Sequence, residues 1–445
     1  MNDRRHEAYL CLVLVTVTAF ASNTNAEATY PPKLPAGKTI HSSSSKKFLN
    51  APKTIRDDVA VAKTPPTIDF LYYPEQNYPG RPWSVWGDSL TTDGKYYSAI
   101  GDHLAPQGNA FVFEYDPDSP SLKTLVNVQK LLDLPEGHYT PGKIHSRIDM
   151  GSDGWLYFST HRGSTRVTTD QYHYEGDWII RHHPKSGKTE TLARGPVPKH
   201  CIPTSVLDPE RLIFYGGTAA GNRTDPVMFF AYDVKARRVL ETAVDGPYRY
   251  IILAKSTGRV YYVNQDGGPL MRYDSKAGGP PVKIDGSIGL RSATEETADG
   301  FVYTVSTRGD GRIWRFNTKT EEIEEMGDAS VGTKDYITSL DVDPTGRFLY
   351  YIPGAHGGSQ QDGTPIVQFD VKKRTKKVLA FLHPFYKEEI GYVMLGTFAS
   401  AIDDTGEKLY VTWNGNRGGA DRRGRFPFDT CAMTVIHIPE SERRP

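Results

Sequence analysis

Short segments rich in β-branched and aromatic residues alternate with polar turns from about residue 67 to the C-terminus. No long stretch keeps an apolar period of about 3.6 residues, so few helices are expected. In one typical unit, the segments from Ile144 to Met150 and from Trp155 to Thr160 flank the dipeptide Asp153-Gly154, which is a strong hairpin signal. The pattern predicts two antiparallel strands. His145, at the start of the first, and His161, after the second, then lie at the same end of the hairpin.

The second strand of this unit recurs along the chain, which indicates a repeat architecture. The copies begin at Lys95-Tyr-Tyr, Trp155-Leu-Tyr, Arg211-Leu-Ile, Arg259-Val-Tyr, Phe301-Val-Tyr, Arg347-Phe-Leu and Lys408-Leu-Tyr. Most copies follow an acidic-to-glycine turn such as Asp299-Gly300, and most precede a third strand that ends like Phe230-Ala-Tyr-Asp233. A spacing of roughly 40 to 60 residues is typical of propeller blades.

The two ends of the repeat region complement each other. The last copy ends at Thr434 to Ile438 without a fourth strand, and the segment from Thr67 to Tyr73 precedes the first copy without a partner. Pairing the two leaves no open blade at the seam. We therefore predict an all-β fold, a seven-bladed β-propeller of four-stranded antiparallel blades over residues 67–445, closed by an N-terminal strand that completes the last blade. A β-sandwich with extra strands would not explain the regular copies.

Two segments precede the predicted propeller. Residues 1–26 combine Arg4 and Arg5 with a short apolar run from Ala8 to Ala21. This is typical of a signal peptide and too short to span a bilayer securely, so a secreted or periplasmic protein is expected, with no membrane span after cleavage. Residues 27–66 are rich in Pro, Ser and Lys and poor in apolar residues, a composition that predicts a disordered linker.

The composition excludes few classes of binding partner. The 53 basic and 53 acidic residues balance, which gives no reason to expect nucleic acid or an anionic membrane surface. After signal cleavage the remaining cysteines would be Cys201 and Cys431. They could form a disulfide, bind a metal or stay unpaired, and the sequence leaves these alternatives open.

Candidate site residues gather at one end of the predicted ring. The loops that enter the first strand and leave the second strand of a blade share one face, and they contain His145, His161, His200, Arg249, Arg291 and His356. The two longest loops on this face are basic and contain Arg162, Arg166, His173 and Arg422. Binding residues concentrate in long loops, so we expect an anionic ligand here.

These residue types favour one reaction class. Histidine, tyrosine and arginine without a carboxylate triad suit proton abstraction next to a carboxylate better than hydrolysis by paired acids. The predicted reaction is β-elimination on a uronic acid, with His145 and His161 as acid and base and Tyr248 as a partner. Arg249 or Arg291 would neutralise the carboxylate. The remaining residues of this face would bind substrate.

The predicted fold, the export signal and the paired histidines on the second blade resemble the seven-bladed propeller polysaccharide lyases, the ulvan lyases most and the oligogalacturonate lyases less. The ulvan lyase pattern is two histidines on one blade with a tyrosine and an arginine from a later one, and His145, His161, Tyr248 and Arg249 match it. The resemblance implies an exported lyase acting on an anionic polysaccharide or oligosaccharide. Oligogalacturonate lyases have a histidine-rich metal site late in the chain, and no such cluster occurs in this sequence, so a manganese-type cofactor is not expected.

Two other classes remain open. A metal-dependent propeller lactonase or hydrolase would hold a metal in the central tunnel with acidic and amide side chains, for which Glu295 and Glu296 are the obvious carboxylates. A structural or tunnel metal is therefore left open, although elimination itself needs none. A non-catalytic propeller that binds glycans or proteins is the third class, because fold alone does not decide function.

Overall fold

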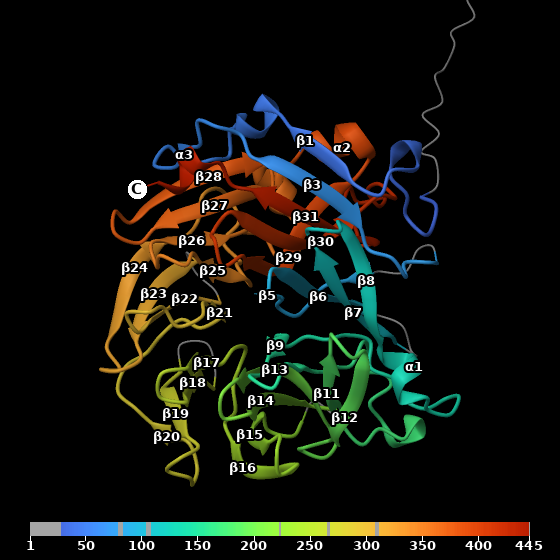
Figure 1. The fold of residues 1–445 in the computed structure, drawn as a ribbon, viewed down its shortest axis with the longest axis vertical. Coiled ribbons are helices and arrows are strands. Elements are labelled where there is room, and N and C mark those ends of the chain that lie inside the picture. Colours follow the sequence, from blue (N-terminus) through green and yellow to red (C-terminus); the bar gives the residue numbers. More distant parts are fainter. Residues whose placement is uncertain are drawn as a thin grey trace, which may run out of the picture.

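The computed structural model describes residues 28–78, 83–103, 108–221, 224–264, 268–307 and 311–444. Its strands form seven sheets that follow one another around a ring, and the chain colour passes once around it (Figure 1). The fold is a seven-bladed β-propeller of four-stranded blades, as the repeats predict. None of the helices in the described ranges is long and apolar enough to cross a membrane.

The blades are built from inner to outer strand in chain order. The first three comprise β5 (Leu90–Thr92), β6 (Lys95–Asp102), β7 (Ala110–Asp116) and β8 (Ser121–Asn127); β9 (Asp149–Met150), β10 (Leu156–Ser159), β11 (Trp178–His183) and β12 (Lys188–Arg194); and β13 (His200–Asp208), β14 (Ile213–Ala220), β15 (Met228–Asp233) and β16 (Arg238–Val244). The short strand β4 (Trp83–Ser84) pairs with the end of β6.

Blades 4 to 6 repeat this order. They comprise β17 (Ile252–Ala254), β18 (Arg259–Val263), β19 (Leu270–Asp274) and β20 (Val282–Lys283); β21 (Ser292–Ala293), β22 (Phe301–Val305), β23 (Arg312–Asn317) and β24 (Ile323–Asp328); and β25 (Leu340–Val342), β26 (Phe348–Tyr351), β27 (Pro365–Asp370) and β28 (Thr375–Phe381). The second strand of each blade coincides with one of the sequence copies, and the alternation of strand and turn therefore located the blades correctly.

The last blade uses strands from both ends of the chain. It comprises β29 (Val393–Ile402), β30 (Lys408–Asn416), β31 (Thr430–His437) and β3 (Thr67–Tyr72). β3 pairs antiparallel with β31, with Thr67 opposite His437 and Tyr72 opposite Ala432. The N-terminal strand thus takes the outer position next to β31, and Figure 1 shows blue β3 beside red β31.

Residues 28–66 differ from the expected disordered linker. β1 (His41–Ser44) adds to the outer edge of β3, and β2 (Ala60–Val61) pairs in parallel with β28. Between them, η2 (Lys46–Leu49) buries Phe48 completely against Phe385 and Tyr386. The prediction from composition was wrong because strand pairing and one aromatic anchor order a segment that is poor in apolar residues.

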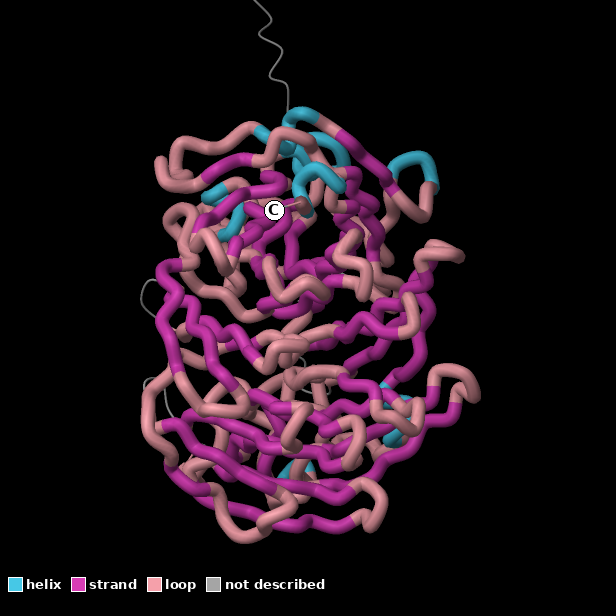
Figure 2. The backbone as a smooth tube through the Cα atoms, turned by 60° about the vertical axis from the view of Figure 1, so that its left-hand side comes forward, coloured by secondary structure: helices cyan, strands magenta, loops and turns pink. Residues whose placement is uncertain are grey.

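The remaining helices are short and lie in connections or at the ends. They are η1 (Pro35–Gly37), α1 (Val128–Leu132), η3 (Asp170–Tyr172), η4 (Ser359–Asp362), α2 (Phe385–Ile390) and α3 (Glu440–Arg443). The tube in Figure 2 shows that strands dominate the body and helices are confined to its periphery.

The core lies between the blades. The described hydrophobic residues form clusters that each join two neighbouring sheets. Successive side chains of a strand point to opposite faces of its sheet, so Phe158 of β10 packs toward blade 1 and Tyr157 toward blade 3. Each blade is therefore hydrophobic on both faces, which explains strands without strict polar alternation.

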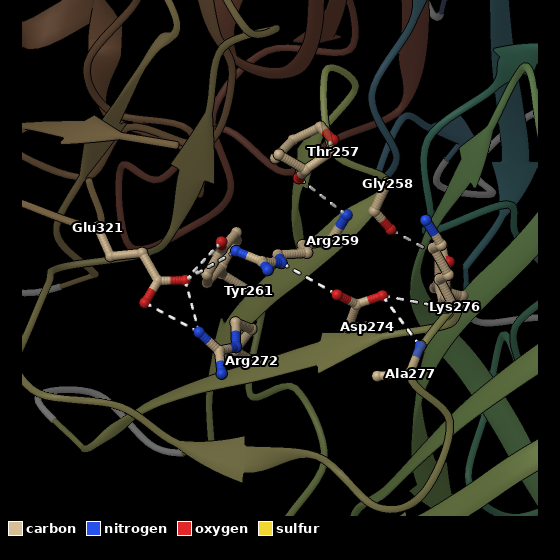
Figure 3. A network of polar contacts seen from close by, with 11 residues as sticks. Thr257, Gly258, Arg259, Tyr261, Arg272, Asp274, Lys276, Ala277 and Glu321 are labelled. Atoms are coloured by element: carbon tan, nitrogen blue, oxygen red, sulfur yellow. Dashed lines mark hydrogen bonds and ion pairs between the residues drawn. The ribbon is translucent and has the colours of Figure 1, made fainter. Parts of the chain in front are cut away.

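Polar networks also join neighbouring blades. Glu321, in the turn after β23 of blade 5, accepts hydrogen bonds from Arg272 Nη1 at 2.9 Å and Tyr261 Oη at 2.9 Å of blade 4 (Figure 3). Within blade 4, Asp274 accepts from Arg259 Nε at 3.1 Å. Such contacts fix the position of one blade against the next. They thereby help to hold the inner strands around the centre.

Candidate functional site

The loops that enter the first strand or leave the second strand of several blades converge at one end of the ring. We call the residues Trp86, His103, Lys143, His145, His161 and His356 the imidazole cluster. Trp86 precedes β5, and His103 follows β6. Lys143 and His145 precede β9, His161 follows β10, and His356 follows β26. The phase predicted from the repeats therefore brings side chains of three blades together.

The two histidines singled out by the sequence are neighbours. The ring centroids of His145 and His161 lie 5.1 Å apart. The expected strands are shorter than predicted, since only Asp149–Met150 and Leu156–Ser159 form β9 and β10. An isolated bridge extends the hairpin, with the backbone nitrogens of Lys143 and His161 each donating to the other's carbonyl oxygen at 3.1 and 2.8 Å. The bridge holds the ends of the two strands at one level.

Glycines permit the close approach of these loops. A Cβ on Gly87 would lie 2.2 Å from the carbonyl oxygen of Ser146, and one on Gly142 would lie 2.6 Å from Cα of Gly163. Both distances are far inside van der Waals contact, so only glycine fits at these positions. The first contact brings Trp86 beside His145, and the second brings Lys143 beside Arg162.

Both imidazoles carry a hydrogen on Nδ1. Nδ1 of His145 lies 2.8 Å from the carbonyl oxygen of Pro203, and Nδ1 of His161 lies 2.9 Å from that of Arg162. A carbonyl oxygen can only accept, so each Nδ1 donates. The Nε2 lone pair of each neutral ring therefore remains available to accept a proton.

Burial and surrounding cations keep these rings neutral. Burial lowers the pKa of His145 well below its ordinary value, and Lys143, Arg291 and Arg249 lower it further. Burial also lowers the pKa of His161, together with Lys143, His145 and Arg162. Among the described residues, the largest contributions to both shifts come from burial and from cationic side chains. The cluster is a site of uncompensated positive charge with two proton acceptors in it.

Arg291 and His356, both predicted to bind substrate, lie at the far side of the cluster with a tyrosine that the sequence analysis missed. Arg291 is 6% exposed and donates from Nε to Tyr336 Oη at 2.7 Å. The Tyr336 ring stacks on His356 at 4.5 Å, and His356 lies 5.9 Å from Trp86. Burial lowers the pKa of His356 to about 4, and Arg291, Arg249 and Lys143 add to the shift.

Arg249 and Tyr248, the other predicted catalytic residues, differ in their placement. Arg249 is exposed, and its charge lowers the pKa of His145 and His356. Its guanidinium lies 4.9 Å from the Tyr248 ring centroid. Within the described chain no contact links Tyr248 to His145 or His161, and Tyr336 is the phenol in contact with Arg291.

The other predicted binding residues surround the cluster or lie outside it. Arg162 donates to Cys201 Sγ and to the carbonyl oxygen of Ala220 at 3.2 Å. His200 is buried with its Nδ1 2.7 Å from Thr218 Oγ1, on the face of β13 opposite to Cys201. His173 stacks on His138 at 4.1 Å in an exposed loop, and the exposed Arg166 and Arg422 have no side-chain contact in the described structure.

The cysteines are free thiols. Cys201 and Cys431 are both buried and unpaired. Cys201 Sγ lies 3.9 Å from His161 Nε2, and burial raises the pKa of this thiol to about 12. A neutral thiol thus borders the cluster.

A cavity of about 310 Å³ lies in the central tunnel beyond the cluster and reaches the turns at the opposite end of the ring, near Pro344 and Asp404. Asp88 accepts from Ser339 Oγ at 3.0 Å, and Asp341 accepts from Ser400 Oγ at 2.5 Å. Burial raises the pKa of Asp88 to about 6 and, together with the charge of Asp88, raises the pKa of Asp341 to about 8.

The carboxylates considered for a tunnel metal already have partners. Glu295 forms ion pairs with Arg147 and Lys255, and Glu296 accepts from Ser256 Oγ at 2.7 Å and from Thr318. Although burial alone would raise it, Lys255 and Arg147 hold the pKa of Glu295 below its ordinary range. Among the described residues no group of three or more histidines, cysteines or carboxylates is arranged to hold a metal ion.

Sequence reasoning missed Trp86, Lys143, Tyr336 and Phe398, although one signal was available. Lys143 stands two positions before His145, so in an extended segment both side chains point to one side. The other three residues come from blades 1, 6 and 7, and only the ring geometry places them beside the histidines. The ring centroids of Trp86 and Phe398 lie 4.7 Å apart.

No family model matches the chain, and no curated protein matches it. Solved structures that are similar include a chain of the mitotic checkpoint complex, with 12% identity, 88% of this chain and 97% of that chain covered, and a TM-score of 0.49. The structure of U3-55K shows 12% identity, with 80% and 96% covered and a TM-score of 0.46. The WD40 repeats of RRP9 show 12% identity, with 81% and 100% covered and a TM-score of 0.46. Nothing about the site follows from these likenesses.

Proposed function

We propose that the protein is a polysaccharide lyase that cleaves a uronic-acid-containing anionic glycan by β-elimination. The observation that carries the proposal is the pair of neutral imidazoles, 5.1 Å apart, whose strongest charged neighbours among the described residues are cations. A ligand carboxylate supplies the missing negative charge, and the aromatic faces of Trp86 and Phe398 suit the apolar face of a sugar ring.

The charges explain how the ligand would activate its own base. Before binding, burial and the charges of Lys143, Arg291 and Arg249 hold the pKa of His145 low, which makes its Nε2 a weak base. A carboxylate beside these cations offsets their field and raises the pKa of the imidazole. The base therefore gains strength when the acidic sugar is in place, which is the moment of proton abstraction.

The chemical step needs only groups of this chain. Arg291, with Arg249, neutralises the uronate carboxylate and acidifies the adjacent C5–H. His145 or His161 takes this proton on Nε2, the C5–H and C4–O4 bonds break, and a C4=C5 double bond forms. Tyr336 Oη accepts from Arg291 Nε, so its own hydrogen is free to protonate the leaving O4. Electrons and protons balance without a redox partner.

Export completes the proposal. Arg4, Arg5 and the apolar run from Ala8 to Ala21 favour secretion, where a large anionic glycan is accessible. This segment lies outside the described residues.

The proposal is tested by incubating purified protein with a panel of sulfated and unsulfated uronate polymers and measuring new near-ultraviolet absorbance from unsaturated uronates. His145→Ala and His161→Ala should each lower the rate by about 10²–10⁴-fold, with circular dichroism unchanged. His183→Ala, at the end of β11 beside Trp155 and apart from the imidazole cluster, serves as the matched control and should keep the rate.

Three outcomes would contradict the proposal. An unchanged rate in either cluster variant removes that residue from the mechanism. Glycan binding without any unsaturated product favours the non-catalytic class. Loss of turnover after chelation, restored by a metal ion, favours the metal-dependent class.

A further inference from the structure

Lys143 stands out because it is a buried cation for which the described residues supply no counter-ion. It is 6% exposed, and lysine is rarely buried unless it is paired. Its Nζ lies 4.9 Å from the centroid of the Trp86 ring. In the described part of the chain, this ammonium contacts the Trp86 ring but forms no ion pair and no hydrogen bond.

The groups that face Lys143 are cations, imidazoles and one thiol. Arg162 and Arg249 repel its charge, and Cys201 is the thiol. The imidazoles of His103, His145, His161 and His356 all respond to the charge of Lys143. These groups come from blades 1, 2, 3, 4 and 6, and no carboxylate acts on the amine from any of them.

The protonation of the amine follows from this setting. Burial, with smaller contributions from Arg162 and Arg249, lowers the pKa of Lys143 to about 7. At neutral pH the amine is therefore divided between its charged and neutral forms. An anion placed against it would favour the charged form.

We infer that Lys143, held over the face of Trp86 without a counter-ion, receives the oxyanion group of the ligand and takes up a proton when that ligand binds. The ligand class is a sugar bearing a carboxylate or a sulfate ester. The inference rests on the proposed anionic sugar ligand but not on its elimination.

Proton uptake gives a readout that is independent of turnover. D-glucuronate has the carboxylate but no glycosidic bond, so it cannot undergo the proposed cleavage. Calorimetric titration at pH 8 in two buffers of different ionisation enthalpy measures the protons taken up. The wild-type protein should take up close to one proton per ligand at this pH, and its affinity should fall more than tenfold from pH 7 to pH 9, since the charged amine is lost over this range.

Variants separate Lys143 from the histidines. Lys143→Arg keeps a permanent cation and should bind D-glucuronate without proton uptake and without pH dependence between pH 7 and pH 9. Lys143→Met should lower the affinity at least tenfold. The exposed Lys372→Met, in the turn between β27 and β28, is the matched control and should behave as wild type.

Glucose and glucose 6-sulfate define the ligand class. Proton uptake with glucose 6-sulfate equal to that with D-glucuronate supports the inference and extends the ligand class to sulfate esters. Proton uptake with D-glucuronate alone limits the ligand class to carboxylates. Proton uptake in Lys143→Arg equal to that of wild type, or glucose binding as tight as that of D-glucuronate, would overturn it. Binding with proton uptake in a protein that cleaves no polymer would leave this inference intact and remove the lyase proposal.

Discussion

At the scale of single residues, the site depends on which ring nitrogen of each histidine already forms a hydrogen bond. The carbonyl oxygens of Pro203 and Arg162 hold Nδ1–H of His145 and His161. This fixes the tautomer of both rings. Ring orientation and proton position are therefore set before any ligand arrives, which lowers the cost of assembling the reactive arrangement.

The two tyrosines next to the arginines provide a test of the proton donor. Tyr336→Phe should lower the elimination rate by about 10²-fold or more, because it removes the hydroxyl that would protonate the leaving oxygen. Tyr248→Phe should leave the rate within about twofold, since no contact joins Tyr248 to the imidazoles. Steady-state kinetics on the polymer that the wild-type protein cleaves measure the elimination rates of both variants.

A slow Tyr248→Phe together with an unaffected Tyr336→Phe would place Tyr248 at the reacting atoms. Tyr248 would then have the role that its match to the ulvan lyase pattern implies. Because Tyr336→Phe also removes the acceptor for Arg291 Nε, circular dichroism checks that the variant keeps its fold.

At the scale of elements, the repeats predict strands far better than connections. Lys95, Arg259 and Lys408 each begin a second strand as the sequence indicates, because strand propensity and the preceding turn are local properties. The segment from residue 28 to 66 was predicted wrongly since its order comes from distant partners, β3, β28 and the aromatic pair of α2. Composition does not contain those contacts.

Phe48→Ala tests the attachment of this segment. Burying a phenylalanine completely stabilises a site by about 3–5 kcal/mol, so the variant should release residues 28–66 from the propeller. Limited proteolysis with mass spectrometry should show faster cleavage between residues 41 and 66 in the variant. The exposed Lys46→Ala on the same short helix is the control.

A disordered linker would be cleaved equally fast in all three proteins. That result would restore the prediction made from composition.

At the scale of the whole molecule, the ring determines which residues meet. Asp88 precedes blade 1 and Asp341 lies on blade 6, yet the charge of one raises the pKa of the other. In the same way Trp86 meets His356 across 270 positions of sequence. The sequence could indicate the end of the ring at which residues gather, but it could not show which loops reach the centre, because loop paths depend on packing between blades.

Asp341→Asn tests the acidic pair in the tunnel. The folded-state pKa of Asp341 is raised to about 8, so its contribution to stability is present at low pH and is lost as pH rises through about 8. The amide does not ionise, and the variant should therefore gain up to about 4 kcal/mol over wild type between pH 5 and pH 9. Urea unfolding at both pH values measures the difference.

The exposed Asp118→Asn is the control for this series and should show the same pH dependence as wild type. A difference between Asp341→Asn and wild type that stays constant from pH 5 to pH 9 would show that Asp341 ionises normally.

The pairing of β3 with β31 has a consequence for how the protein is made. Residues 67–72 leave the ribosome first, but their partner, residues 430–437, is synthesised only after the six blades that lie between them in the sequence. Until then the ring of the nascent protein stays open and β3 has no strand to pair with. Removal of β31 (Thr430–His437) and the residues after it should therefore prevent circular closure altogether instead of shortening one edge.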